Sequence, residues 1–366
     1  MSRPVAAVVS FRLGGADGVS VEAAKWAWAL RELGFSVRTV AGAGPVDHLI
    51  PPLAAPPAVT DGEPDPLAGA NAALDVASTK AQVEAALAGA DLVIVENLLS
   101  LPLNPGAAEV VAAALRGRRA VLRHHDLPWQ RPRFAAGSPP PDDPAWRHVT
   151  INDHSRAELA RLGIAATVIP NAFDPHPPAG DRAATRRALG VGDDQWVVLQ
   201  PTRAIPRKNV GAGLALAEAL GAVFWVLGPA EEGYGPELSR LLAAATVPTR
   251  HGPCGPVSAT AGIEHAYAAC DVVAFPSVEE GFGNPPVEAS LQRRPVAVGR
   301  YRVAAEMAAA GFRWFDADDH EAIGHFLRHP DSRLLDHNEH IARTRFSLEQ
   351  LPARLSHLLR DAGWTW

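Results

Sequence analysis

The sequence predicts two α/β domains, each built around a doubly wound parallel sheet. Short apolar runs alternate with segments of helical periodicity along most of the chain, as in parallel sheets that helices cover on both faces. A proline-rich stretch at residues 170–180 interrupts this pattern, which then begins again. The 366 residues are too many for one typical domain and suit two of about 150–200 residues each.

The first half of the chain contains one clear amphipathic helix among several predicted strands. The helix is predicted at residues 19–33, because Ala23, Trp26 and Leu30 recur at helical spacing and Gly34 is placed to end it. Segments rich in proline, glycine and alanine at residues 51–66 and 135–144 are typical of loops. The strands are predicted at residues 6–10, 36–40, 91–95, 120–123, 149–152 and 166–169.

The second half repeats this organisation after the proline-rich stretch. Its predicted strands are residues 196–200, 223–227, 271–275 and 296–298, and its predicted helices are 210–220, 237–245 and 259–269. A last helical pattern covers residues 348–359. We therefore expect a first domain at residues 1–174, a second at residues 175–347 and a C-terminal helical segment at residues 348–366.

The amino-acid composition limits the kinds of partner that the protein is expected to bind. The net charge of −6 argues against nucleic acid, because phosphate-backbone binding needs a basic surface. The sequence has no run of eighteen apolar residues, so we expect no membrane span, and its first residues are typical of a strand rather than a signal peptide. Cys254 and Cys270 lie outside any CxxC or Cys/His cluster, which predicts no structural zinc and suits a reducing cytoplasm.

The most informative motif is EEGFGNPPVEA at residues 279–289, which follows a predicted strand and opens a helix. Gly281 and Gly283 allow backbone N–H groups to approach an anion, and the start of the helix adds a positive dipole end. A diphosphate fits this loop, with Glu280 accepting hydrogen bonds from sugar hydroxyls and Glu288 from ribose hydroxyls. An ordinary loop with helix-terminal carboxylates is the alternative, but it leaves the spacing of glycines, prolines and glutamates unexplained.

A basic segment, PTRAIPRKN at residues 201–209, follows the first predicted strand of the second domain. Its Arg203 and Lys208 could neutralise the charge that grows on a departing diphosphate. Alone, the segment would be better explained as a solvated basic turn. The glutamate motif later in the same domain favours the functional interpretation.

These two motifs, in this order, resemble the retaining GT-B glycosyltransferases of the family-four group, which includes glycogen-synthase-like and mannosyltransferase-like enzymes. Glu280, the Gly-Phe-Gly loop at residues 281–283 and Glu288 match the signature of that group in order. Asn284 stands where leucine or isoleucine is more usual, and Thr202 stands where glycine is usual before the arginine.

The resemblance implies two Rossmann-like domains facing across a cleft, with the C-terminal helix returning to the N-terminal domain. It implies transfer of a hexose from a nucleoside diphosphate sugar to a hydroxyl acceptor, with retention, by same-face substitution. No cofactor or metal is required, because Arg203 and Lys208 replace a metal ion at the diphosphate. The donor would be bound by both cations, by the loop of Gly281, Phe282, Gly283 and Asn284, and by Glu288.

In the first domain the resemblance points to two further segments. The glycine-rich turn at residues 13–19 would let the donor approach through Gly15 and Gly18. A dinucleotide site competes for this turn, but the chain lacks Gly-x-Gly-x-x-Gly. His125 matches the histidine that faces the donor sugar in the family, and its neighbour His124 remains open for that role. A structural histidine in a turn is the simpler alternative for either.

The acceptor side is predicted from residues that follow strands of the first domain. These are Glu96, Asn97, His124, Asp126 and Trp129. Trp129 could stack on a sugar ring, and Arg131 and Arg133 beside it could bind an acidic acceptor. A surface loop packed by one tryptophan explains this segment equally well.

The predicted partners are thus a nucleotide sugar and a hydroxyl acceptor. Resemblance to the mannosyltransferase-like members favours GDP-mannose over UDP-linked glucose or N-acetylglucosamine. A sugar-nucleotide epimerase of the same fold is disfavoured because that group lacks the Gly-Phe-Gly loop between its glutamates. An NAD-dependent dehydrogenase is disfavoured by the missing fingerprint, and a non-catalytic binding protein by the presence of both cations and both glutamates.

Overall fold

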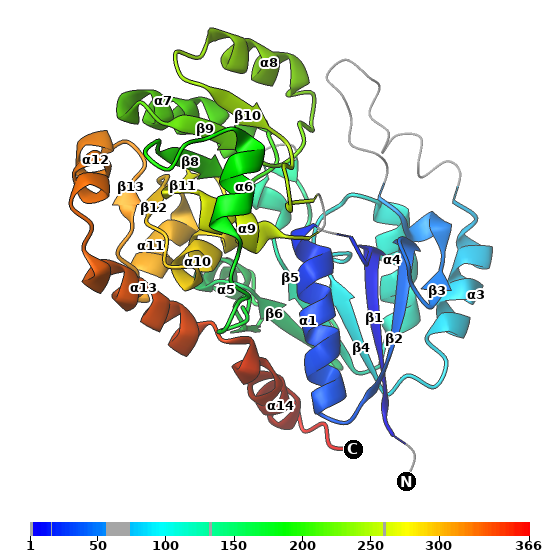
Figure 1. The fold of residues 1–366 in the computed structure, drawn as a ribbon. Helices are drawn as coiled ribbons and strands as arrows, with labels where there is room; N and C mark the ends of the chain where they lie inside the picture. Colours follow the sequence, from blue (N-terminus) through cyan, green and yellow to red (C-terminus); the bar gives the residue numbers. More distant parts are fainter. Residues whose placement is uncertain (1–2, 16, 56–73, 132–133, 259–260) are drawn as a thin grey trace. The chain divides into compact units, whose positions relative to one another are not determined.

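The computed structural model describes residues 3–15, 17–55, 74–131, 134–258 and 261–366. Most of the loop predicted at 51–66, Arg133 and the first residues of the helix predicted at 259–269 lie outside these ranges. The chain divides into two compact units (Figure 1). One comprises Met1–Ala172 together with Leu348–Trp366, and the other comprises Phe173–Ser347.

The first unit is built on a seven-stranded sheet in the order β3-β2-β1-β4-β5-β6-β7, and every strand pair assigned in it is parallel. The central strands β4 and β5 are buried along their whole length, as expected where helices cover both faces of a sheet. The strands are β1 (Val5–Arg12), β2 (Ser36–Ala43), β3 (His48–Leu49), β4 (Leu92–Glu96), β5 (Ala120–His124), β6 (Trp146–Thr150) and β7 (Ala166–Val168).

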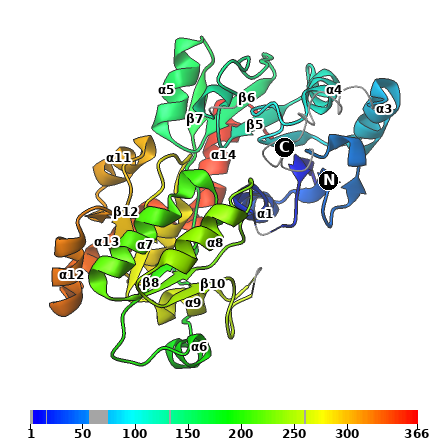
Figure 2. The same cartoon turned by 90° about the horizontal axis from the view of Figure 1, so that it is seen from above.

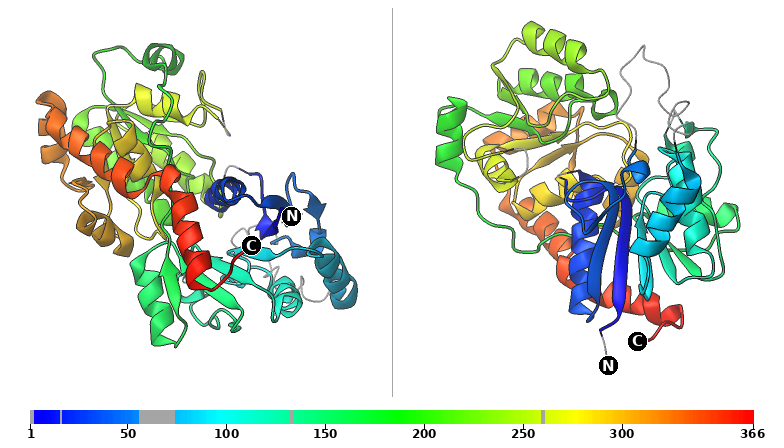
Figure 3. Two further views of the ribbon diagram at one scale, coloured as in Figure 1. Left: turned by 90° about the horizontal axis from the view of Figure 1, so that it is seen from below. Right: turned by 90° about the vertical axis from the view of Figure 1, so that its right-hand side faces the viewer.

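Two hydrophobic layers cover this sheet. On one face, α3 (Val76–Ala86) and α4 (Pro105–Leu115) pack against alternate strand residues such as Val9 and Val95. On the other face, α1 (Gly18–Glu32) and α14 (Leu351–Asp361) pack against residues such as Val8 and Ile94. Figure 3 shows α14 lying beside α1, and the two helices are in contact. The remaining helices are α5 (Asp153–Arg161) and the short turns η1 (Pro51–Leu53), η2 (Pro128–Gln130) and η5 (Leu348–Gln350).

The second unit contains a six-stranded parallel sheet in the order β10-β9-β8-β11-β12-β13. Its strands are β8 (Val197–Gln200), β9 (Val223–Val226), β10 (Thr249–His251), β11 (Val272–Phe275), β12 (Val296–Val298) and β13 (Phe315–Asp316).

Helices and a buried arginine complete the second unit. Helices α7, α8 and α12 contribute to one hydrophobic core with the sheet, and α6 packs against α9 (Figure 2). Arg186 of α6 is almost fully buried and binds Asp271, just before β11. The helices are α6 (Arg182–Leu189), η4 (Pro206–Lys208), α7 (Val210–Leu220), α8 (Gly235–Ala244), α9 (Ile263–Ala269), α10 (Asn284–Leu291), α11 (Arg302–Ala309), α12 (His320–Arg328) and α13 (Ser332–Arg345).

In both sheets the strand order reverses beside the first strand of the unit. The reversal lies between β1 and β4 in the first sheet and between β8 and β11 in the second. Connections leave such a pair of strands in opposite directions, so a crevice opens at their carboxyl ends, where open α/β sheets bind ligands. Loops after β1, β4, β8 and β11 are therefore the places to examine for function.

Some elements begin at a different residue from the one that the sequence indicates. Strand β6 begins at Trp146 rather than 149, because Arg147 and His148 interrupt the apolar run while the backbone still pairs with β5. Helix α9 begins at Ile263, where Gly262 adopts a positive φ of 85° that ends the preceding turn.

We predict that Leu355→Ala in α14 destabilises the first unit by about 2–5 kcal/mol, because it opens a cavity against the α1 face of the sheet. The free energy of unfolding, measured with urea, checks this. His357→Ala is the matched control, because His357 lies on the same helix with an exposed side chain. An equal loss of stability in both variants would contradict the packing of α14 described above.

Candidate active site

The loops that follow β8 and β11 bring two cations onto one carboxylate. Lys208 Nζ donates to Glu280 Oε1, and Arg207 donates to Glu280 Oε2 at 3.0 Å. Arg207 also donates to the backbone oxygen of Glu279 at 3.0 Å, which ties the two loops together. The cluster lies at the strand pair where the sheet order reverses.

Burial makes this cluster electrostatically strong. The Lys208 side chain is 10% exposed and that of Glu280 is 9% exposed, and the ammonium also lies over the Phe275 ring at 5.0 Å. Burial lowers the pKa of Lys208 to about 8, although Glu280 acts in the opposite direction. Burial would raise the pKa of Glu280, but the charges of Lys208 and Arg207 outweigh it and lower that pKa. The carboxylate is thus held ionised between two cations.

The glycine loop leads from this cluster into α10. Gly283 caps the helix with a φ of 95°, and a Cβ added there would lie 2.5 Å from the Tyr301 hydroxyl. Only glycine fits both conditions. Phe282 is buried and its ring packs with those of Phe173 and Phe346, which anchors the loop to the unit. Asn284 carries the first backbone N–H of α10, and the two prolines that follow it carry none.

Arg203, in the loop after β8, and Glu288, in α10, have other partners. Arg203 donates to Glu231 at 2.6 Å, and both side chains are about two-fifths exposed. Glu288, in α10, accepts a hydrogen bond of 2.7 Å from the Tyr267 hydroxyl. Burial, and then the Glu288 carboxylate, raises the pKa of Tyr267, so this phenol stays a donor. An exposed ion pair such as Arg203–Glu231 is weak and can be exchanged for a ligand at little cost.

In the first unit, Arg123 organises the carboxyl ends of the central strands. Its side chain is fully buried on β5 and binds Glu96 of β4 at 3.3 Å and Glu22 of α1 at 3.0 Å. It also donates to Asn171 at 3.0 Å and lies over the Trp26 ring at 4.6 Å. Lys25 also binds Glu22, at 2.6 Å, so two cations face the two buried carboxylates.

Glu96 and Asn97 were expected to face the acceptor, but their polar atoms are turned to the protein. Glu96 is fully buried and its second partner is His125 Nε2, at 2.7 Å. Asn97 adopts a left-handed φ of 59°, and its side-chain oxygen accepts from the backbone N–H of His125 at 3.1 Å. Both residues therefore fix the position of His125. No bond to His125 Nδ1 occurs within the described ranges.

His124 belongs to a different set of contacts. It is buried, with Nδ1 bonded to the Ser100 hydroxyl and Nε2 bonded to His148 at 2.9 Å. His148 in turn bonds to Asp142 at 3.1 Å. Burial, together with the charges of His148 and His125, lowers the pKa of His124 well below its usual value. Both nitrogens of His124 are thus occupied, which separates its role from that of His125.

The other residues predicted on the first unit lie nearer its surface. Asp126 pairs with Arg131 at 2.8 Å. Trp129 donates to Glu158 at 2.9 Å and packs beside a small apolar cluster. In the glycine-rich turn, a Cβ added at Gly15 would lie 3.0 Å from Asp17, whereas one at Gly18 would meet open space. Asp17 caps α1 through its bond to the Ser20 N–H.

Several residues of both clusters lie outside the site predicted from the sequence. Arg207 adjoins Lys208, and the pair of adjacent cations is the signal that indicates it. Arg123 directly follows three apolar residues of β5, which is a sign of a buried ion pair. Glu22, Ser100 and His148 reach the first unit's clusters from three other elements, so no local pattern links them.

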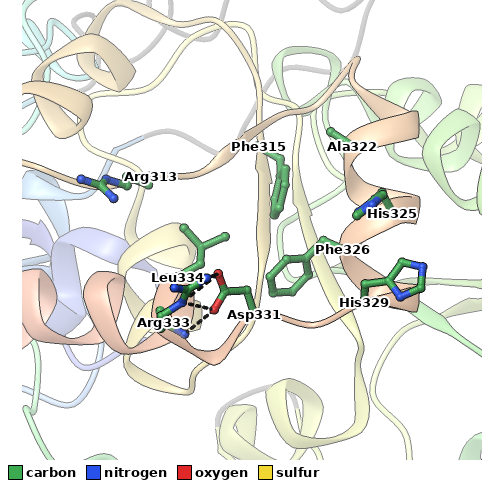
Figure 4. A pocket seen from close by; sticks show the side chains of 9 residues that line it. All are labelled: Arg313, Phe315, Ala322, His325, Phe326, His329, Asp331, Arg333 and Leu334. Atoms are coloured by element: carbon green, nitrogen blue, oxygen red, sulfur yellow. Dashed lines mark hydrogen bonds and ion pairs between the residues drawn. The ribbon is translucent and has the colours of Figure 1, made fainter.

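One hollow lies away from the predicted donor residues. A hollow of about 710 Å³ on the second unit lies between β13, α12 and α13 and contains none of the predicted donor residues (Figure 4). Within the described residues, no three His, Cys, Asp or Glu side chains gather as a metal site would require. No helix of those residues has the length and apolarity to cross a bilayer.

The second unit matches a known family. Residues 181–328 match the model described as glycosyl transferases group 1. The chain is 25% identical over 328 residues to mannosylglucosylglycerate synthase from Thermotoga maritima, which covers 74% of this chain and 76% of the relative. It is 32% identical over 196 residues to D-inositol 3-phosphate glycosyltransferase from Mycobacterium tuberculosis, covering 49% of this chain and 39% of that relative.

Solved structures resemble both units together. Anabaena Alr3699/HepE, in complex with UDP and glucose, covers 97% of this chain and 99% of its own, with a TM-score of 0.69 and 20% identity. Sucrose-phosphate synthase from Thermosynechococcus elongatus covers 98% and 99%, with a TM-score of 0.72 and 15% identity. These likenesses establish the fold of two Rossmann-like domains. Residues 181–328 thus match the glycosyl transferases group 1 family, and the chain as a whole has the GT-B fold.

Proposed function

We propose that this protein transfers a hexose from a nucleoside diphosphate sugar to a hydroxyl group of an acceptor, with retention of anomeric configuration. The observation that carries the proposal is the cluster of Arg207, Lys208 and Glu280 at the carboxyl ends of β8 and β11, beside the glycine loop that opens α10. Two cations against one carboxylate leave a net positive charge where a diphosphate would meet the backbone N–H groups of the glycine loop and of Asn284.

The donor diphosphate would bind to Lys208 and to the backbone N–H groups of the glycine loop and of Asn284. Glu280 holds Lys208 and Arg207 in place before the donor arrives, so little reorganisation is needed when charge develops on the leaving group. Arg203 would join them by leaving its exposed pair with Glu231. Gly281, Phe282 and Asn284 complete the loop, and Glu288 would accept from the ribose hydroxyls.

Retention is proposed to occur by same-face substitution. The bond between the anomeric carbon and the diphosphate oxygen breaks, and the acceptor oxygen forms its bond to that carbon on the face that the diphosphate leaves. The acceptor's proton passes to the departing phosphate oxygen, so charge and atoms balance. Stabilising that oxygen is therefore the main task of Lys208 and of the cations beside it.

His125 is proposed to contact the donor sugar. Glu96 accepts from its Nε2, and Asn97 holds its backbone, so the ring is fixed with Nδ1 available for a ligand. Gly15 and Gly18 in the turn after β1 would give the donor room. Asp126 and Trp129 are left as acceptor-side candidates, with Trp129 oriented by Glu158.

GDP-mannose is the donor that we propose. Support comes from the names of two relatives, the mannosylglucosylglycerate synthases of Thermotoga maritima and Petrotoga mobilis. UDP-glucose is the second candidate, because the similar structure of Alr3699/HepE was solved in complex with it. The donor requires no cofactor in either case.

A panel of nucleotide sugars tests this function. The purified chain is incubated with GDP-mannose, UDP-glucose and UDP-N-acetylglucosamine, and nucleotide release and thermal shift are measured. We expect GDP-mannose to stabilise the protein and to be turned over fastest. A chain that no nucleotide sugar stabilises would not be a transferase of this kind, and product with inverted configuration by NMR would exclude same-face substitution.

Substitutions distinguish the role of Glu280 from that of its neighbour Glu279. We predict that Lys208→Ala lowers kcat by about 10²–10³-fold, as expected for loss of a group that stabilises the leaving oxygen. Glu280→Gln should lower kcat at least about tenfold, because both cations lose the charge that positions them. Glu279→Gln is the matched control, since only its backbone oxygen contacts Arg207. Equal rates in the two glutamine variants would refute the assignment of Glu280.

The pH dependence follows from Lys208. Its pKa of about 8 means that the ammonium is charged below that pH and neutral above it. We predict that kcat/KM for the donor falls about tenfold per pH unit above pH about 8. Lys208→Arg keeps its charge over this range and should lack the fall, whatever its absolute rate. A fall that persists unchanged in this variant would assign it to another group.

A further inference from the structure

A mainly apolar groove lies in the first unit, beside the residues that fix His125. Its volume is about 600 Å³, and it runs between α4 and the turn that follows β4. Leu98, Leu99, Leu101, Pro105, Ala112 and Pro139 supply much of its lining. The turn is closed by backbone bonds from Ser100 and Leu101 to Asn97, the residue that also binds the His125 backbone. The groove therefore starts one turn from the proposed sugar site.

Ser100 lines this groove and is connected to the surface by a chain of hydrogen bonds. Its hydroxyl bonds to His124 Nδ1, His124 Nε2 bonds to His148 Nδ1, and His148 Nε2 bonds to Asp142. Asp142 is 56% exposed at the far end. Burial lowers the pKa of both histidines, which favours their neutral forms.

The ionised end fixes the direction of every bond in the chain. A carboxylate only accepts, so His148 Nε2 carries a proton and its Nδ1 accepts. His124 Nε2 must then donate to His148, which leaves His124 Nδ1 to accept the Ser100 proton. The Ser100 hydroxyl hydrogen is thus committed to His124, and its remaining lone pairs can only accept from a group in the groove.

The charged lining residues give the groove no net positive charge, which disfavours an anionic occupant. Arg116 is bound by the backbone oxygen of Asp142 and by Asp143. Glu109 adds a negative charge to the same lining. A hydroxyl group, by contrast, would find two acceptors there, Ser100 and Glu109.

We propose that this groove binds the apolar part of a neutral acceptor and that a hydroxyl group of the same molecule donates to Ser100 Oγ. The acceptor class is then an amphiphile, such as a sugar or polyol that carries an alkyl chain. This inference rests on the proposed transfer, because it names the acceptor of that reaction. Ser100 is a specificity-determining residue in this account.

Calorimetric binding of methyl, n-hexyl and n-octyl glucosides, below the micelle-forming concentration and without donor, tests the groove. We expect affinity to rise about fourfold for each methylene that the groove buries. Ala113→Trp should abolish that rise, because Ala113 is an exposed residue of α4 that lines the groove. Ala81→Trp on α3, also exposed but outside the groove, should retain it.

Ser100 and Asp142 are tested with the octyl glucoside. Ser100→Ala should weaken its binding about fivefold to tenfold, which corresponds to loss of one hydrogen bond. Asp142→Ala, a substitution at an exposed residue, removes the carboxylate that fixes the direction of these hydrogen bonds. It should also weaken binding of the octyl glucoside. Equal affinity for the methyl and octyl glucosides, or a chain-length effect that survives Ala113→Trp, would overturn the proposal. Because no donor is present, a failed transfer assay and an empty groove are distinguished.

Discussion

The buried contact of Lys208 and Arg207 with Glu280 is the interaction on which the proposed chemistry depends. Parallel strands whose order reverses between β8 and β11 bring the two loops together, and the ion cluster then fixes them. Burial lowers the pKa of the lysine, while the carboxylate limits that change. Glu280 thus favours the charged form of Lys208 in the free protein, which is the form that binds a diphosphate. The Glu280 carboxylate thus joins the two loops, favours the charged lysine and positions the cations that the proposed function needs.

In the first unit the charges are reversed, because one arginine pairs with two carboxylates. There, Arg123 lies between two buried carboxylates, and one of them, Glu96, orients His125. Removing one of these ion-pair partners would leave a buried charge without compensation. The ion pairs therefore hold the side chains in place and do not themselves bind a ligand. His124, one residue away, is held by an independent chain through His148. Adjacent histidines on one strand end are therefore committed to different tasks.

Local patterns were sufficient to predict the fold and half of the candidate site. Buried parallel strands such as β4 and β11 can be recognised in the sequence as short apolar runs. The glycine loop can be recognised because a side chain at Gly283 would collide with Tyr301, so only glycine fits there. The partners of those loops could not be predicted in the same way. Glu22 meets Arg123 across 101 positions of sequence, and pairing at that separation is decided by the strand order. Glu96 is the last residue of β4, and its burial distinguishes an orienting role from contact with an acceptor.

Proton uptake on binding of the donor tests the central claim most directly. At pH about 8 roughly half of the Lys208 side chains lack a proton in the free protein, and a bound diphosphate would restore it. Calorimetric titration with GDP-mannose in buffers of different ionisation enthalpy measures that proton. We expect uptake of about half a proton per donor at pH about 8, and none in Lys208→Arg. Binding without proton uptake, or with the same uptake in the arginine variant, would contradict it.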